Sequence, residues 1–501
     1  MMTLRLHSYE QKLALILLGL LVLRLIGLFT VSWGLHGDEA QYWAWSQDPD
    51  FGYFSKPPMI AWVIGLSTSI FGNAEWAVRL SAPFLHIATS AMIFFAGRRL
   101  FTPQVGFWAA LTYTLMPAVW LSSYIMSTDA TLLLCWAIAL HGWVCLRDGG
   151  GWARVLQLGL ALGFGLLSKY AMAFMIPVIG LAVIFDRPSR IALLNLKGIV
   201  VTALAIALLT PNLMWNAAHE FATISHTADN ASLGRDLFNP GEVLSFWGDQ
   251  FGVFGFLPFP ILIIALFAVF KGRLPTPAKW LAALTALPLF AITVEALLSR
   301  ANANWAVTAY VAAPILVALW ATQSQRKLAW LKWGLIGQTI LVLIIGGIAS
   351  SERSVDAAGM NNAVKRLRAW PETAKAVRAY LPNADYAYVA VDNRLMFYDL
   401  NYYPIIPQSG RPKHEATPEL AMWSLNASPA HHASLTRALP NTNMPVLIIS
   451  QHHNFEAYFR DDFETLTPLE PIKIDLGPNK IRHLKVWRGT GYKRTSREDR
   501  T

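Results

Sequence analysis

The stretch that decides the fold is Lys12 to Trp45, KLALILLGLLVLRLIGLFTVSWGLHGDEAQYWAW. Its first part is an apolar run long enough to cross the roughly 30 Å hydrocarbon core of a bilayer as a helix. No small-residue cleavage site follows the run, so we expect a retained anchor. Directly behind it, two adjacent carboxylates, Asp38 and Glu39, stand among aromatic residues. This start indicates a membrane protein whose first loop carries acidic residues at the membrane surface.

The composition of the whole chain agrees with its first helix. Of 501 residues, 54% are hydrophobic and 14% charged, and the mean hydropathy is +0.38. Soluble domains carry roughly 25% charged residues, so we do not expect a purely soluble protein. The net charge of +10 is typical of basic cytoplasmic loops in a membrane protein, and we predict no nucleic acid partner.

Most of the first 350 residues form apolar runs bounded by charges, prolines or glycines. We count eleven spans and expect the shorter Pro57–Phe71 segment to be an interfacial helix, because basic loops then gather on one side. The N-terminus is predicted to be cytoplasmic. The runs cover residues 12–33, 77–97, 104–124, 129–146, 153–168, 170–185, 198–214, 244–270, 278–298, 305–322 and 328–349.

The chain is predicted to have two domains. Residues 1–350 form a transmembrane domain with catalytic outer loops at 34–76 and 215–243. Residues 351–501 contain no run long enough to span, and extended runs at 386–391 and 446–450 follow a helical stretch at 361–380. We therefore expect a small extracytoplasmic α/β domain there. It has no GxGxxG and no P-loop.

The first outer loop offers a base and a cation. A carboxylate at Asp38 or Glu39 that is partly out of water could accept a proton from a hydroxyl nucleophile, or Asp38 could simply cap a helix. Lys56 precedes Pro57 and Pro58 at the membrane boundary. Its ammonium could pair with a phosphate, or it could be a snorkelling lysine.

Further candidates lie on other outer segments. Lys169 stands between two short helices, and Asp129 begins the fourth span, where it could assist the chemistry or cap the helix. Asn216 and Arg235 in the third long loop could bind a polar head group. Two histidines of that loop, His219 and His226, have no further ligands at metal spacing, so the sequence predicts no certain cofactor and supports no divalent metal site.

Together these strings resemble a known family. HGDEAQYW, GYFSKPPMIAW, STDATLLL, GLLSKYA, PNLMWNAAHEF and ANWAVTAY follow one another within residues 8–325. This order is similar to that of the bacterial GT-C membrane glycosyltransferases related to protein O-mannosyltransferases and lipid A aminoarabinose transferases. The resemblance implies an α-helical polytopic fold of GT-C type with polyprenyl-phosphate-linked sugar donors.

The resemblance also implies roles for individual residues. Asp38 matches the catalytic aspartate, Glu39 its neighbour, Asp129 the second-loop acid and Lys56 the phosphate-contacting lysine. We assign the remaining candidates to the donor phosphate or substrate, namely Lys169, Tyr42, Tyr170, Asn216 and Arg235.

We therefore expect an enzyme of the bacterial inner membrane that transfers a sugar, with inversion, from a polyprenyl phosphate to an acceptor on the periplasmic face. Lipid A or another glycolipid is favoured over protein as the acceptor. Two alternatives stay open, a protein O-glycosyltransferase of the same fold and a membrane transporter. A transporter would be expected to show internal repeats around a midplane site.

Overall fold

The computed structural model describes residues 8–31, 33–230, 237–382, 385–405, 418–452 and 454–495. The chain divides into two compact units. The first comprises Met1–Thr30 and Lys56–Gly347, and the second comprises Val31–Ser55 and Ile348–Thr501. Residues Val31–Ser55, which follow the first helix, thus belong to the same compact unit as the C-terminal residues.

The first unit is helical, and α18 runs from it into the second unit. Its helices are α1 (Tyr9–Thr30), α3 (Met59–Phe71), α4 (Glu75–Arg79), α5 (Ser81–Leu100), α6 (Pro103–Thr114), α7 (Pro117–Ser122), α8 (Thr128–Arg147), α9 (Trp152–Ser168), the 3₁₀ turn η1 (Tyr170–Phe174), α10 (Met175–Phe185), α11 (Arg187–Leu193), α12 (Leu196–Ala218), α13 (Ala222–Asn230), α14 (Pro240–Phe254), α15 (Pro258–Phe270), α16 (Ala278–Leu298), α17 (Ala309–Ala321) and α18 (Gln325–Ala349).

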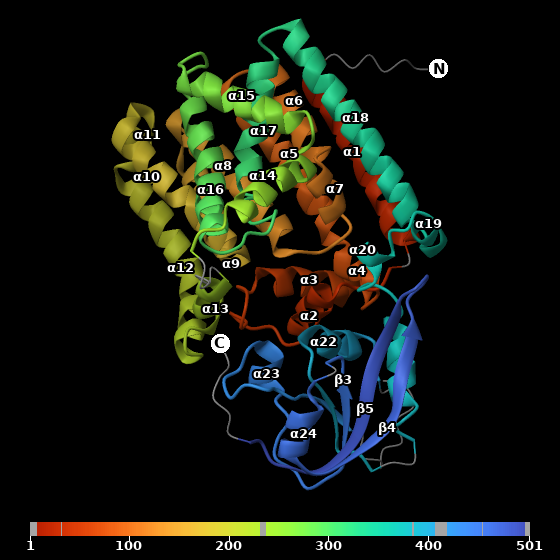
Figure 1. The fold of residues 1–501 in the computed structure, drawn as a ribbon. Helices are drawn as coiled ribbons and strands as arrows, with labels where there is room; N and C mark the ends of the chain where they lie inside the picture. The colour runs from red at the N-terminus through yellow and green to blue at the C-terminus, as the bar shows by residue number, and fades with distance from the viewer. Residues whose placement is uncertain are drawn as a thin grey trace. The chain divides into compact units, whose positions relative to one another are not determined.

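The centre of this unit is formed by α5, α6, α8 and α17, which contact one another (Figure 1). Every residue of α17 is buried. Glycines let α5 and α6 approach closely, since a Cβ at Gly106 would lie 2.5 Å from the Phe94 carbonyl oxygen. Apolar side chains elsewhere on the unit are exposed, among them Phe270 at 81% and Leu244 at 75%. Such a surface suits a hydrocarbon environment.

The number of spans differs from a simple count of apolar runs. Within the described residues, six helices are long and apolar enough to cross a membrane, or up to eight if each bent pair is one span. Shorter apolar helices occur at Met59–Phe71, Trp152–Ser168 and Ala309–Ala321. Eleven crossings and their orientation remain a prediction.

Three expected runs are interrupted in the structure. The run 244–270 is broken between α14 and α15, which meet at 108°, because Gly255 adopts a φ of 118° and Pro258 starts the next helix. The run 104–124 stops after α6, since Pro117 disfavours helical backbone in Met116 before it. The run 170–185 opens as the 3₁₀ turn η1. The hydropathy of these three runs did not predict the breaks.

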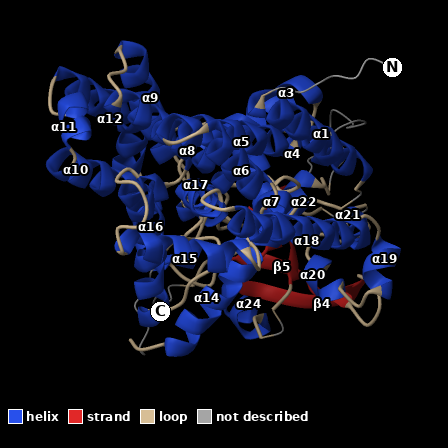
Figure 2. Cartoon of the chain, turned by 90° about the horizontal axis from the view of Figure 1, so that it is seen from above, coloured by secondary structure: helices blue, strands red, loops and turns tan. Residues whose placement is uncertain are grey.

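The second unit contains a five-stranded sheet of order β2-β1-β3-β5-β4. Strands β1 (Tyr388–Val391), β2 (Glu419–Met422) and β3 (Val446–Ser450) are parallel, while β4 (Phe463–Asp475) and β5 (Ile481–Tyr492) form an antiparallel pair beside β3. Figure 1 shows β3, β5 and β4 in this order, and strands are red in Figure 2. β1 and β3 lie within the two extended runs expected from the sequence.

Helices complete this unit, and one of them comes from the segment Val31–Ser55. They are α2 (Gly37–Ser46), α19 (Glu352–Ala357), α20 (Asn361–Val364), α21 (Trp370–Arg378), α22 (Arg394–Tyr402), α23 (His432–Thr436) and α24 (Glu456–Asp462). α2 packs on α22, where the Trp43 and Tyr402 rings meet edge to face at 4.8 Å. One core of the unit gathers Trp423, Phe459 and Trp487. The expected α/β character of the C-terminal residues is confirmed.

Candidate active site

The first polar centre lies at the start of α8. Asp129 is in the first turn of this helix, and its residue is only 8% exposed. Its two carboxylate oxygens accept hydrogen bonds from Lys169 Nζ at 2.8 Å and from Asn304 Nδ2 at 2.9 Å. Ser127, the residue before the helix, makes no side-chain cap. The Asp129 carboxylate is therefore held by side chains from distant segments.

The backbone of Lys169 explains why its side chain can reach this carboxylate. Lys169 ends α9 and precedes η1 with an extended backbone, φ −164° and ψ 137°. An extended residue between two helical segments changes the direction of the chain. Its side chain therefore does not lie along the face of either helix. Lys169 and Asp129 form an ion pair that is mostly shielded, with 21% and 11% of their side chains exposed.

A second lysine acts on the same carboxylate. Lys56 contributes a smaller electrostatic attraction to Asp129 than Lys169 does. Two ammonium groups thus act on one carboxylate at this centre. Lysine ammonium groups bind phosphate groups in many proteins, so such a centre suits an anionic ligand.

A group of neutral polar side chains surrounds the next residue, Tyr170. Its hydroxyl donates to Asn212 Oδ1 at 2.8 Å and accepts from Asn216 Nδ2 at 3.3 Å. Asn216 Oδ1 accepts from the backbone N–H of Thr223 at 3.2 Å. Two of the predicted substrate residues, Tyr170 and Asn216, are therefore in direct contact. Arg235 lies outside the described residues.

The second polar centre is in the other unit, at the start of α2. His36 and Glu39 cap this helix: Nδ1 of His36 accepts from the Asp38 N–H at 3.2 Å, and Glu39 Oε2 accepts from the His36 N–H at 2.9 Å. Glu39 is 1% exposed. The capping role considered for Asp38 is thus carried by its neighbours, and Glu39 has a structural function.

The Asp38 carboxylate contacts an arginine and a histidine side chain. Its Oδ1 lies 3.1 Å from Arg394 Nη2, and its Oδ2 lies 3.7 Å from His36 Nδ1. Arg394 also donates to the side-chain oxygen of Gln41 on the same helix. Asp38 is 42% exposed in its side chain, so it is accessible rather than enclosed. Tyr42 is buried, with its ring 5.4 Å from that of Trp45.

A buried carboxyl group lies close to this centre. Asp399 on α22 is 1% exposed, and burial raises its pKa well above the usual range. Arg482 opposes the shift, while Asp38 and Glu39 add to it by charge repulsion. The carboxylates of Asp38 and Glu39 therefore influence the pKa of Asp399.

The described histidines make other contacts, not a cluster of possible metal ligands. Across the residues that the structure describes, no group of three His, Cys, Asp or Glu could hold a metal ion. His219 stacks on Trp215 at 4.0 Å, and His452 pairs with Asp392 at 3.0 Å. Burial lowers the pKa of His431 to about 4, so its ring is neutral and Nδ1 accepts from the Ser434 N–H as a cap of α23.

Three residues of these centres were not identified from the sequence. Asn304 lies inside the ANWAVTAY string, at the boundary of an apolar run. A polar amide side chain at such a boundary is a signal that could have identified this residue. Asn212 was quoted only as part of its string. Arg394 lies 356 residues beyond Asp38 in the sequence and had no pattern to mark it.

Comparisons with known proteins identify the family. Residues 55–215 match the family described as dolichyl-phosphate-mannose-protein mannosyltransferase. The lipid A galacturonosyltransferase RgtD of Rhizobium johnstonii is 36% identical over 399 residues, which cover 77% of this chain and 81% of that protein. The chain belongs to this family of membrane glycosyltransferases.

Other members of the family and a solved structure agree. The undecaprenyl phosphate-α-4-amino-4-deoxy-L-arabinose arabinosyl transferase of Edwardsiella ictaluri is 26% identical over 45% of this chain and 47% of that protein. ArnT from Cupriavidus metallidurans, solved with undecaprenyl phosphate, has a TM-score of 0.64 at 14% identity and covers 95% of this chain and 97% of that chain. The family fold is therefore of the expected GT-C type, and this glycosyltransferase is a multi-pass membrane protein.

Proposed function

We propose that this glycosyltransferase moves a sugar from a polyprenyl-phosphate carrier to lipid A on the periplasmic face of a bacterial inner membrane. The 36% identity to a lipid A galacturonosyltransferase over most of both chains supports lipid A as the acceptor. It also makes galacturonic acid the first sugar to test. Membership in a transferase family favours the enzyme over the transporter alternative.

The observation that carries the proposal is the centre of Asp129, Lys169 and Lys56. Its two lysine ammonium groups suit the phosphate of a lipid carrier. The phosphodiester of the donor becomes a more negative monoester as the sugar leaves. Cations held in place at this point stabilise the transition state more than the ground state. Asp129 and Asn304 then act by fixing the position of the Lys169 ammonium.

In the proposed reaction, an acceptor hydroxyl oxygen attacks the anomeric carbon of the sugar. The bond from that carbon to the phosphate oxygen breaks, polyprenyl phosphate leaves, and direct displacement inverts the anomeric configuration. Asp38 takes the proton of the hydroxyl as a general base, because it is exposed and because Glu39 is engaged in capping. Arg394 orients the carboxylate of Asp38 in this reaction.

The proposed orientation follows from charge. Basic residues gather in the loops 98–99, 147–154, 187–197, 271–279 and 326–332, which we place in the cytoplasm with the N-terminus. The second unit is then periplasmic. Nucleotide sugars stay in the cytoplasm, so a lipid-linked donor is what a periplasmic reaction requires.

A protein acceptor is the second candidate, because the matched family is described by a protein mannosyltransferase activity. Mass spectrometry of lipid A and of periplasmic proteins from a deletion strain separates the two. We expect lipid A to lose one sugar substituent, restored by the wild-type chain and not by Asp38→Asn. Unchanged lipid A together with a lost protein glycan would overturn the proposed acceptor.

Donor binding is tested separately from transfer. Lys56→Ala should bind polyprenyl phosphate more weakly, while Lys56→Arg keeps the charge with a different shape and should be intermediate. Lys12→Ala, on the predicted cytoplasmic side, is the matched control. Equal binding by all of these variants would remove Lys56 from the phosphate site.

A further inference from the structure

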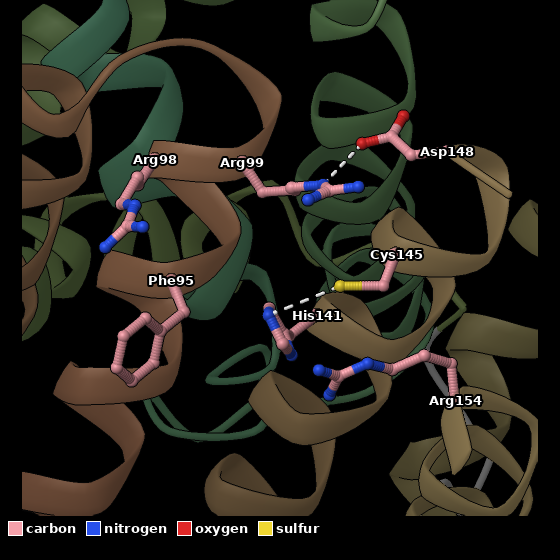
Figure 3. Close-up of a pocket in the computed structure, with 7 residues that line it drawn as sticks. All are labelled: Phe95, Arg98, Arg99, His141, Cys145, Asp148 and Arg154. Carbon is pink, nitrogen blue, oxygen red and sulfur yellow. Dashed lines mark hydrogen bonds and ion pairs between the residues drawn. The ribbon is translucent and has the colours of Figure 1, made fainter. Parts of the chain in front are cut away.

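A cationic pocket lies at the other end of α8 from Asp129. It is lined by side chains from the end of α5, the second half of α8 and the start of α9, and its volume is about 480 Å³. The rise of 1.5 Å per residue separates Asp129 from Cys145 by about 24 Å. The pocket is therefore distinct from the proposed donor centre. Its lining residues are Phe95, Arg98, Arg99, His141, Cys145, Asp148 and Arg154 (Figure 3).

Positive charge exceeds negative charge in this pocket. Arg99 is paired with Asp148 at 2.6 Å, and Arg98 is paired with Glu10 of α1 at 3.0 Å. Arg154 donates instead to the neutral side chain of Gln157, at 2.6 Å, so no described carboxylate neutralises its guanidinium within 4 Å. The pocket keeps a net positive charge even when Glu10 is included.

Hydrogen bonds hold the floor of the pocket in one arrangement. The Gln157 amide nitrogen donates to His141 Nδ1 at 3.0 Å and to the Ile138 carbonyl at 2.9 Å. Because His141 Nδ1 accepts, its Nε2 carries the proton and points at Cys145 Sγ, 3.4 Å away. Figure 3 shows Arg154 pointing toward His141 across the pocket. The Arg154 guanidinium is thus held in position by Gln157.

One wall of the pocket is apolar and open. Phe95 on α5 is 43% exposed beside the arginines. A phosphate with an attached hydrocarbon chain would meet the arginine side chains and, beside them, an exposed aromatic ring. A free phosphate ion would gain nothing from contact with an apolar wall. Basic pockets between transmembrane helices bind anionic lipid head groups for this reason.

The geometry points to a binding site for the phosphate of an anionic phospholipid, held by Arg154 and Arg98 with the acyl chain along Phe95. This site does not depend on the proposed sugar transfer. In the predicted orientation it faces the cytoplasmic leaflet, where the basic loops gather.

Native mass spectrometry of the full-length protein in detergent tests the site. The probes are phosphatidylglycerol, the zwitterionic phosphatidylcholine and inorganic phosphate. We expect the wild type to retain phosphatidylglycerol in preference to phosphatidylcholine. Arg154→Gln should weaken that retention about fivefold, as should Arg98→Gln, while Arg154→Lys should keep most of it. Arg273→Gln, an exposed arginine outside the pocket, is the matched control and should behave as wild type.

Three results would overturn the inference. The first is equal retention of the two lipids by the wild type. The second is unchanged retention in both Arg154→Gln and Arg98→Gln. The third is displacement of phosphatidylglycerol by an equal concentration of inorganic phosphate, which would make the pocket a site for soluble phosphate. Thermal unfolding of each variant confirms that the folded protein is being compared.

Discussion

The Lys169 ammonium lies 2.8 Å from the Asp129 carboxylate, although the two residues are 40 positions apart in the sequence. Asn304 occupies the other oxygen of the same carboxylate. Three separate segments of the helical unit therefore converge on one buried charge. A lysine held in this way can face a donor phosphate in one fixed position. Removal of the lysine leaves the Asp129 carboxylate without its main partner.

Breaking this pair should destabilise the protein. Lys169→Ala leaves a shielded carboxylate unpaired, and we expect a loss of about 3 kcal/mol in the free energy of unfolding. Asp129→Asn combined with Lys169→Ala should cost less than the sum of the single changes, because the pair acts as a unit. The exposed pair Arg460–Glu456 is the control and should contribute no more than about 0.5 kcal/mol. Strictly additive effects in a double-mutant cycle would contradict the coupling.

Asp38 should matter for the rate rather than for donor binding. Asp38→Asn keeps the shape of the side chain and removes the base, so transfer should fall by about 10² or more while polyprenyl phosphate still binds. Asp48→Asn, an exposed position of the same loop, should leave both quantities unchanged. Turnover of Asp38→Asn close to that of the wild type would remove Asp38 from the mechanism.

Arg394 should position the Asp38 carboxylate. Arg394→Ala removes the contact at 3.1 Å and lets the carboxylate rotate, so kcat should fall by roughly 10-fold to 10²-fold with little change in KM. Arg394→Lys keeps a charge and should recover part of the rate. If both variants instead raise KM and spare kcat, Arg394 contacts substrate and does not orient the base.

The buried Asp399 predicts a pH dependence of stability. Its folded-state pKa is raised by burial, so the folded protein holds a proton that the unfolded chain has already lost. The resulting stabilisation is present at low pH. It declines as the pH rises from about 4, the unfolded aspartate value, through the raised folded value.

Asp399→Asn tests this dependence because the amide resembles the protonated acid. The variant should lose the decline in thermal stability with rising pH, and Asp461→Asn, at an exposed position, should keep it. A variant whose stability follows the wild-type pH curve would show that Asp399 titrates normally.

Much of the fold was predictable because apolar runs and extended runs are local signals. β1 and β3 lie within the two extended runs that were expected, and most apolar runs became helices. The breaks at Gly255 and Met116 were missed because hydropathy does not record backbone conformation. A single φ of 118° turns one expected span into two helices at 108°.

The candidate site was predictable only where chemistry coincided with a motif. Asp38, Lys56, Asp129 and Lys169 were identified from charged residues at the ends of apolar runs. The pairing of Lys169 with Asp129 and of Arg394 with Asp38 depends on tertiary packing, which no spacing reveals. The capping of α2 by His36 and Glu39 likewise required the backbone geometry to be seen.

Sugar transfer from a lipid-linked donor to lipid A is measured most directly with the purified protein and defined substrates. Lipid A is incubated with polyprenyl-phosphate-linked galacturonic acid or with the corresponding nucleotide sugar, and the products are identified by mass spectrometry. We predict sugar-bearing lipid A and free polyprenyl phosphate with the lipid-linked donor only, and no product with Asp38→Asn. Transfer from the nucleotide sugar, or modification of a protein acceptor while lipid A stays unmodified, would contradict the proposed reaction.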